Sequence, residues 1–118
     1  MLGVKVESKL DAVIGPESEL KGDVSVRGSM RLDGRIEGNV SVMDSLFTGK
    51  GSHIRGEVHC KDGVFAGKIE GNVTASGTVE MQAGGSLLGD IKCRNLILDH
   101  DAFLDGRVKM TDQATEVS

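Results

Sequence analysis

One short pattern recurs six times along the chain and constrains its fold more than any other feature. An aliphatic residue stands two positions before a glycine, another stands two positions after it, and a small apolar residue stands four positions after it. The first copy is Leu20-Lys-Gly-Asp-Val-Ser-Val26 and the last is Leu104-Asp-Gly-Arg-Val-Lys-Met110. Intervals of 16, 18, 15, 18 and 17 residues separate the anchor glycines Gly22, Gly38, Gly56, Gly71, Gly89 and Gly106.

Polar residues separate the apolar positions of each copy, and this alternation indicates what the repeated unit is. It has the period of a half-buried β-strand or of a bent pair of strands. One copy buries a single apolar stripe and is not stable alone, whereas six stacked copies bury a continuous core. The 17 glycines among 118 residues also oppose a helical bundle, because each costs roughly 1 kcal/mol inside a helix. The chain is therefore predicted to be an all-β parallel solenoid of about six turns.

A second apolar segment lies between consecutive copies, for example at Leu46-Phe47 and Val64-Phe65. Each turn should therefore hold two or three short strands joined by tight corners, which gives a triangular cross-section. We expect the glycines outside the anchors to provide corners with positive φ, which glycine adopts without steric cost. These corner glycines are Gly15, Gly34, Gly49, Gly51, Gly67, Gly84 and Gly85.

The repeat length bears on handedness and on the class of function. A left-handed hexapeptide β-helix, as in an acyltransferase-like enzyme, needs an unbroken six-residue phase and 18-residue turns. Intervals of 15, 16 and 17 residues break that phase, so we predict a right-handed parallel β-helix. The enzyme stays as an alternative, and it would need a catalytic histidine at a groove between subunits.

Charge and composition exclude several classes of partner. The 14 basic residues are dispersed among 18 acidic ones, and no basic cluster is interleaved with aromatic residues, so neither DNA nor RNA is an expected partner. No apolar run approaches the length of a membrane span. The first ten residues lack the apolar segment of a secretion signal, so we expect a cytoplasmic protein.

The histidines and cysteines do not form a recognisable site. No pair among His53, His59 and His100 has the spacing of a zinc site. Cys60 and Cys93 share a core column but lie two turns apart, roughly 9.6 Å between strands, which exceeds the ~7 Å limit for a disulfide. We expect both thiols to be small buried apolar groups.

Two further motifs are also expected to be structural. The segment Gly49-Lys-Gly-Ser52 is not a phosphate-binding loop, because no helix pattern follows it. The carboxylates Asp99, Asp101 and Asp105 near the last corner are expected to be a solvated loop rather than an acid–base pair. The sequence therefore predicts no catalytic, cofactor, nucleotide or metal site, and no enzyme.

A solenoid has two open ends, which expose backbone donors and acceptors above an apolar core. We divide the chain into a tail or partial first turn at 1–12, the β-helix at 13–110, and a flexible C-terminal tail at 111–118. No cap is evident, so end-to-end stacking is expected, with a monomeric adaptor as the alternative. The residues expected at the stacking interface are Val13, Ile14, Leu20, Val24, Leu96, Leu98, Phe103, Leu104, Val108 and Met110.

Over roughly residues 13–110 the chain resembles the bactofilins, bacterial polymer-forming cytoskeletal proteins. The resemblance rests on six glycine motifs in this order and spacing, and on longer matching segments. These segments are Val13-Ile-Gly, Leu20-Lys-Gly-Asp-Val, Met30-Arg-Leu-Asp-Gly-Arg-Ile-Glu-Gly-Asn-Val, Val64-Phe-Ala-Gly-Lys-Ile-Glu-Gly-Asn-Val and Val79-Glu-Met-Gln-Ala-Gly-Gly-Ser-Leu-Leu-Gly-Asp-Ile.

The resemblance implies a right-handed β-helix that assembles without nucleotide into non-polar filaments, joined head to head and tail to tail. It also implies scaffolding in cell shape, cell-wall synthesis or polar positioning. The implied partners are other copies of the chain, cell-wall enzymes and the inner face of the membrane.

Overall fold

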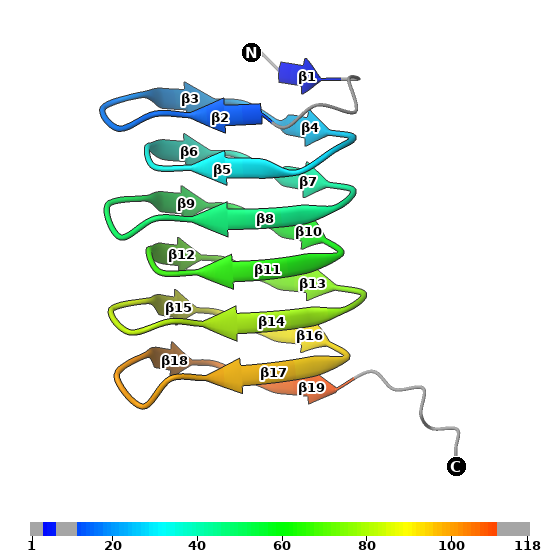
Figure 1. Ribbon diagram of the computed structural model, residues 1–118, viewed down its shortest axis with the longest axis vertical. Coiled ribbons are helices and arrows are strands. Elements are labelled where there is room, and N and C mark those ends of the chain that lie inside the picture. Colours follow the sequence, from blue (N-terminus) through cyan, green and yellow to red (C-terminus); the bar gives the residue numbers. More distant parts are fainter. Residues whose placement is uncertain (1–3, 7–11, 111–118) are drawn as a thin grey trace.

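The computed structural model describes residues 4–6 and 12–110, and these residues form a solenoid of stacked, parallel strands (Figure 1). The N-terminal tail or partial turn and the C-terminal tail predicted from the sequence lie largely outside the described residues. In Figure 1 the nearer strands run to the left and the more distant ones to the right while the chain descends. This path is right-handed, as predicted, and the left-handed enzyme fold is therefore wrong.

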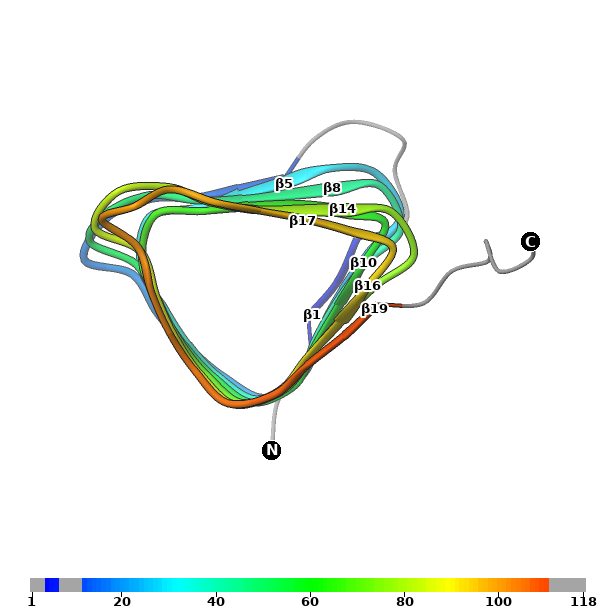
Figure 2. The ribbon, with the colours of Figure 1, turned by 90° about the horizontal axis from the view of Figure 1, so that it is seen from below.

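Three parallel sheets form the sides of a triangle, which is evident along the rod axis (Figure 2). Each turn of the chain passes through the sheet that we name B, then sheet C, then sheet A. Sheet A contains β1 (Val4–Val6), β4 (Val24–Val26), β7 (Val40–Val42), β10 (Val58–Cys60), β13 (Val73–Ala75), β16 (Ile91–Cys93) and β19 (Val108–Met110).

Sheets B and C each contain six strands, one from each turn. Sheet B contains β2 (Ala12–Ile14), β5 (Met30–Leu32), β8 (Ser45–Thr48), β11 (Asp62–Phe65), β14 (Thr78–Met81) and β17 (Asn95–Leu98). Sheet C contains β3 (Glu19–Lys21), β6 (Arg35–Glu37), β9 (His53–Arg55), β12 (Lys68–Glu70), β15 (Ser86–Leu88) and β18 (Phe103–Asp105). The repeated motif is therefore a bent pair of strands, one in sheet C and one in sheet A.

The bend of each motif falls on the anchor glycine, which has a positive φ in all six copies, from 127° at Gly22 to 155° at Gly106. From Gly38 onward, a Cβ on each anchor would collide with the carbonyl oxygen of the anchor in the preceding turn. Glycine is therefore required in the anchor column for two reasons, its positive φ and the close approach of the backbones of successive turns.

The expectation of positive φ at the other corner glycines was mostly wrong. Gly84 has a φ of 85°, but no positive φ occurs at Gly15, Gly34, Gly49, Gly51, Gly67 or Gly85. At several of these corners glycine is needed because neighbouring backbone atoms leave no space for a Cβ. A Cβ on Gly34 would lie 2.5 Å from the carbonyl oxygen of Ser18, and one on Gly67 would lie 2.5 Å from that of Gly49.

Apolar side chains in the same position of successive turns stack into columns inside the triangle. One column contains Ile36, Ile54, Ile69 and Leu87, all at most 1% exposed. The aromatic ring of Phe65 occupies the space beside Gly63, which has glycine where the neighbouring turns have Leu46 and Val79. The core is therefore continuous along the rod, and its packing differs locally from turn to turn.

Polar side chains on the outside reinforce the register of the turns. The residue after each of four anchor glycines is Asp or Asn, and its Oδ1 accepts a hydrogen bond from the backbone N–H of the corresponding residue one turn later. These bonds run to Asp23 from Asn39 (3.1 Å), to Asn39 from Glu57 (3.2 Å), to Asn72 from Asp90 (3.1 Å) and to Asp90 from Arg107 (3.0 Å). On sheet C, Arg55 lies 3.3 Å from Glu70 and 4.0 Å from Glu37.

Both thiols are buried and free, as predicted. Burial, with a smaller contribution from the Asp62 carboxylate, raises the pKa of Cys60 from 9.0 to about 12. Burial also raises the pKa of Cys93. The folded chain thus holds these thiols protonated at a pH at which an unfolded chain would ionise them.

This shift predicts a pH dependence of stability. The contribution of Cys60 to the free energy of unfolding is fully present below pH 9. It is lost between about pH 9 and 12, because the thiol ionises at a lower pH in the unfolded chain than in the folded one. In that window we expect the free energy of unfolding to fall with a slope of up to about 1.4 kcal/mol per pH unit from this group. Urea titrations at pH 8 and pH 10 should show this fall in the free energy of unfolding. In Cys60→Val the fall should be smaller, and valine suits the site because Val42 occupies the same column one turn earlier. An unchanged pH slope in the variant would contradict the assignment.

Candidate assembly surfaces at the ends of the solenoid

The end surfaces follow directly from the strand order. At the C-terminal end the last strands of the three sheets are β17, β18 and β19, and each pairs with another described strand on one side only. At the N-terminal end the corresponding strands are β2, β3 and β1. A parallel edge strand leaves a row of backbone donors and acceptors unpaired, and these can pair with another chain.

At the C-terminal end, several columns of core side chains finish with an exposed residue. Met81 is 0% exposed, but Leu98, which is next in its column, is 41% exposed. Ile91 is 1% exposed and Val108, next in its column, is also 41% exposed. These side chains are exposed because, within the described residues, no further turn packs on them. The remaining predicted residues there that face inward are exposed Met110 and partly buried Leu96 and Leu104.

Two apolar residues of the last turn face outward at the rim. Phe103, which was predicted at the interface, is 55% exposed and lies in register with Ser86 of the preceding turn. Ile97 is also exposed but was absent from the predicted interface. Its signal was present in the sequence, since Leu96-Ile97-Leu98 is apolar in both the inward and the outward positions of one strand.

The N-terminal end is arranged differently. Val13 is exposed and faces outward from sheet B, while Ile14 and Leu20 are partly buried against the core. Val24 is only 3% exposed, because its strand β4 lies between β7 and β1. With β1 in place Val24 is not available for contact, and β1 rather than β4 forms the edge of sheet A at this end.

The corner between β17 and β18 contains the one group of possible metal ligands in the described residues. Ligand atoms of Asp99, His100 and Asp101 lie within 4.8 Å of one another. His100 lies 3.4 Å from each of the two carboxylates, and its side chain is 90% exposed. Three consecutive, solvated side chains of a turn lack the enclosed, oriented ligand set of a protein metal site.

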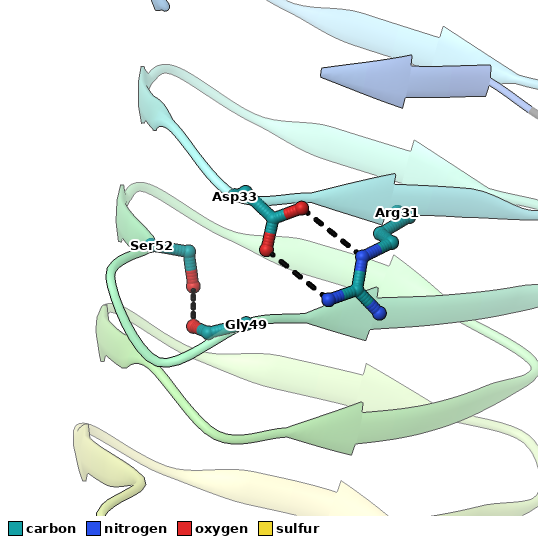
Figure 3. A network of polar contacts seen from close by, with 4 residues as sticks. All are labelled: Arg31, Asp33, Gly49 and Ser52. Atoms are coloured by element: carbon teal, nitrogen blue, oxygen red, sulfur yellow. Dashed lines mark hydrogen bonds and ion pairs between the residues drawn. The ribbon is translucent and has the colours of Figure 1, made fainter. Parts of the chain in front are cut away.

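The corner Gly49–Ser52 is closed by its own hydrogen bonds (Figure 3). The Ser52 hydroxyl donates to the carbonyl oxygen of Gly49 at 2.7 Å, and the Ser52 N–H donates to the same oxygen at 3.1 Å. Ser52 is buried, so this hydroxyl serves the turn itself. Residues 4–6 and 12–110 also include no helix long and apolar enough to cross a membrane.

Comparison with known proteins agrees with this geometry. A family model for bactofilin, described as polymer-forming cytoskeletal, matches residues 12–109. No curated protein and no solved structure was matched. The matched segment begins at the first strand of sheet B and ends within β19, so it spans the described solenoid except β1 and Met110. The chain therefore belongs to the bactofilin family of polymer-forming cytoskeletal proteins.

Proposed function

We propose that the chain assembles end to end, without nucleotide, into non-polar filaments that serve as a cytoplasmic scaffold. The observation that carries this proposal is the C-terminal end, where inward-facing side chains of all three sheets lose the cover that their column neighbours have one turn earlier. Joining two such ends restores both the apolar packing and a partner for the edge strands.

The driving force for this junction lies in the chain itself. Fully burying one large aliphatic side chain contributes roughly 1.5–3 kcal/mol, and several are partly exposed at each end. Association costs at least about 4 kcal/mol in lost rotational and translational freedom. Burial of the exposed parts of several such side chains at once would therefore offset this cost, in place of energy from nucleotide hydrolysis.

The scaffold role and the partners are also part of the proposal. Head-to-head and tail-to-tail junctions would produce a filament without polarity. Its long sides would position cell-wall enzymes or approach the inner face of the membrane, in support of cell shape or polar positioning. Family membership supports the structural role, since bactofilins are polymer-forming cytoskeletal proteins.

Phe103→Arg tests the proposal most directly. Phe103 lies on the outer rim of the last turn, so the charge should block the junction without entering the core. We expect filaments for the natural chain and short species or monomers for the variant, by sedimentation and negative-stain microscopy, with unchanged β-rich circular dichroism. Leu104→Arg should also block assembly but lose some stability, because Leu104 packs against the core. Leu88→Arg, an outward position one turn earlier, is the matched control.

Three results would contradict the proposal. A natural chain that stays monomeric at high concentration would favour the monomeric adaptor. A discrete closed trimer would point to a different quaternary arrangement altogether. Filaments that form equally well with Phe103→Arg would place the junction elsewhere.

A further inference from the structure

Sheet B has an outward-facing column unlike that of sheet A. Its residues pair in register from turn to turn, and Val13, Phe47 and Ile97 in it are 69%, 39% and 53% exposed. The column reads Val13, Arg31, Phe47, Val64, Glu80 and Ile97. The equivalent column of sheet A between β4 and β19 is polar throughout, with Ser25, Ser41, His59, Thr74, Lys92 and Lys109.

When this column is placed against a second copy of itself in reverse order, apolar residues face apolar residues and Arg31 faces Glu80. We propose that sheet B is a lateral interface that pairs with sheet B of a second copy in antiparallel orientation. A two-fold axis parallel to the strands, midway between β8 and β11, would place Arg31 opposite the partner's Glu80. The same axis would place Phe47 opposite the partner's Val64, and Val13 opposite the partner's Ile97. Every apolar residue then meets an apolar one, and each charge meets its opposite.

The parallel arrangement of the same two faces is less favourable. A two-fold axis along the rod would place Arg31 opposite the partner's Arg31 and Glu80 opposite the partner's Glu80. Like charges placed against each other cost several kcal/mol in an interface. The flanking positions agree with the antiparallel arrangement, since Asp33 would oppose the partner's Gln82 and Ser45 would oppose the partner's Asp62.

The surface near the proposed axis is shaped to receive a side chain. An open recess of about 490 Å³ lies beside Phe47 and Val64, and its lining includes Ala66, Glu80 and Gln82. It lies beside a short corner, because two residues join β11 to β12 whereas four join β8 to β9 and β14 to β15. The partner's Phe47, facing Val64, would lie at this recess, and the two-fold axis gives the partner an identical recess.

The charged side chain of Arg31, at the rim of this interface, is positioned by a contact with Asp33. Arg31 Nε lies 3.0 Å from Asp33 Oδ2, and the second guanidinium contact to Asp33 Oδ1 is 3.4 Å (Figure 3). The Arg31 side chain is nevertheless 59% exposed, so it keeps donors for a carboxylate of another chain. Glu80 has no ion-pair partner within residues 12–110 and provides that carboxylate.

This face is small, which fits lateral contact between filaments better than a stable dimer. Six strands at ~4.8 Å spacing and a width of about 10 Å give on the order of 300 Å² per copy, well below the ~800 Å² of a standard interface. Many such contacts in series act together once the rods are joined end to end. The inference therefore rests on the proposed filament and predicts paired or bundled filaments.

Cross-linking tests the orientation. Chains with Phe47→Cys and chains with Val64→Cys, carrying different affinity tags, are mixed, assembled and treated with a short bismaleimide. The antiparallel face predicts mixed-tag dimers, whereas the parallel face predicts dimers of one tag only. Both positions lie in the middle turns, so end junctions contribute neither product. The natural chain, with Cys60 and Cys93 buried, is the background control.

Charge variants test the pairing itself. Glu80→Arg in both chains should reduce the mixed product about tenfold and separate filament pairs in micrographs. Adding Arg31→Glu should restore both, because the two signs are then exchanged. Glu57→Arg makes the same change of charge on the sheet A side and should leave the product unchanged.

The outcomes separate this inference from the proposed function. Filaments without mixed-tag product, or with equal product for Glu80→Arg, would overturn the lateral interface and leave end-to-end assembly intact. If the natural chain forms no filaments, the proposed function fails. The mixed product, measured at high protein concentration, then still decides whether sheet B is an interface.

Discussion

Gly71→Ala should lower the free energy of unfolding by about 3 kcal/mol or more, among the largest effects of any single substitution in this chain. Gly71 has a φ of 145°, a conformation that is almost confined to glycine and that costs other residues about 1–3 kcal/mol. The added Cβ would also collide with the carbonyl oxygen and carbonyl carbon of Gly56. Because the obstacle is backbone, relief requires that two turns move apart.

Urea unfolding followed by circular dichroism measures this effect, and Gly51→Ala is its control. Gly51 has no positive φ, and nothing in the structure lies within 4 Å of the site of its Cβ. At such a site alanine stabilises a protein by roughly 0.4–1 kcal/mol through the unfolded state. Equal losses for the two variants would refute the stacked glycine column.

Phe65→Ala should cost about 3–5 kcal/mol, as is typical for the loss of a fully buried aromatic ring. The ring is 0% exposed and occupies the space beside Gly63, where a Cβ would lie 2.9–3.0 Å from two of its carbons and still closer to a third. Gly63→Leu should also destabilise the natural chain, because the core has no room for a second large side chain.

The double variant distinguishes this interpretation from general sensitivity of the core. In Gly63→Leu/Phe65→Ala the leucine fills the vacated space, as Leu46 does in the neighbouring turn, so the double variant should be more stable than the sum of the two losses predicts. The same denaturant titrations provide all four free energies. Additive losses would show that Gly63 and Phe65 do not share one packing site.

Much of the exposed apolar surface at the C-terminal end could be located from the sequence, because it depends on column order. Leu98 and Val108 are exposed since they are the last members of their columns among the described residues, and position in the last repeat predicts this directly. Val24 shows where that reasoning fails. It belongs to the first full repeat, but β1 adds one more strand to sheet A and Val24 is buried. A three-residue strand before the first anchor has too weak a pattern to predict its pairing.

The corner glycines show a second limit. Local rules assign a glycine at a corner to positive φ, but Gly34 and Gly67 are required by carbonyl groups that belong to the preceding turn. Such a contact joins residues 16–18 positions apart in the chain, and no local pattern encodes it. The lateral face on sheet B could not be predicted for the same reason. Arg31 and Glu80 belong to one outward-facing column only because their strands are paired in register.

By itself the sequence determined the solenoid, its number of turns and its repeat unit, because alternating apolar residues that recur every 15–18 residues are buried together when the copies stack. Only the tertiary structure decided which strand covers each end, which glycines are required by space rather than dihedral angle, and how Phe65 and Gly63 share one site. These features depend on contacts between turns, where the positions of neighbouring backbones are set by the whole stack.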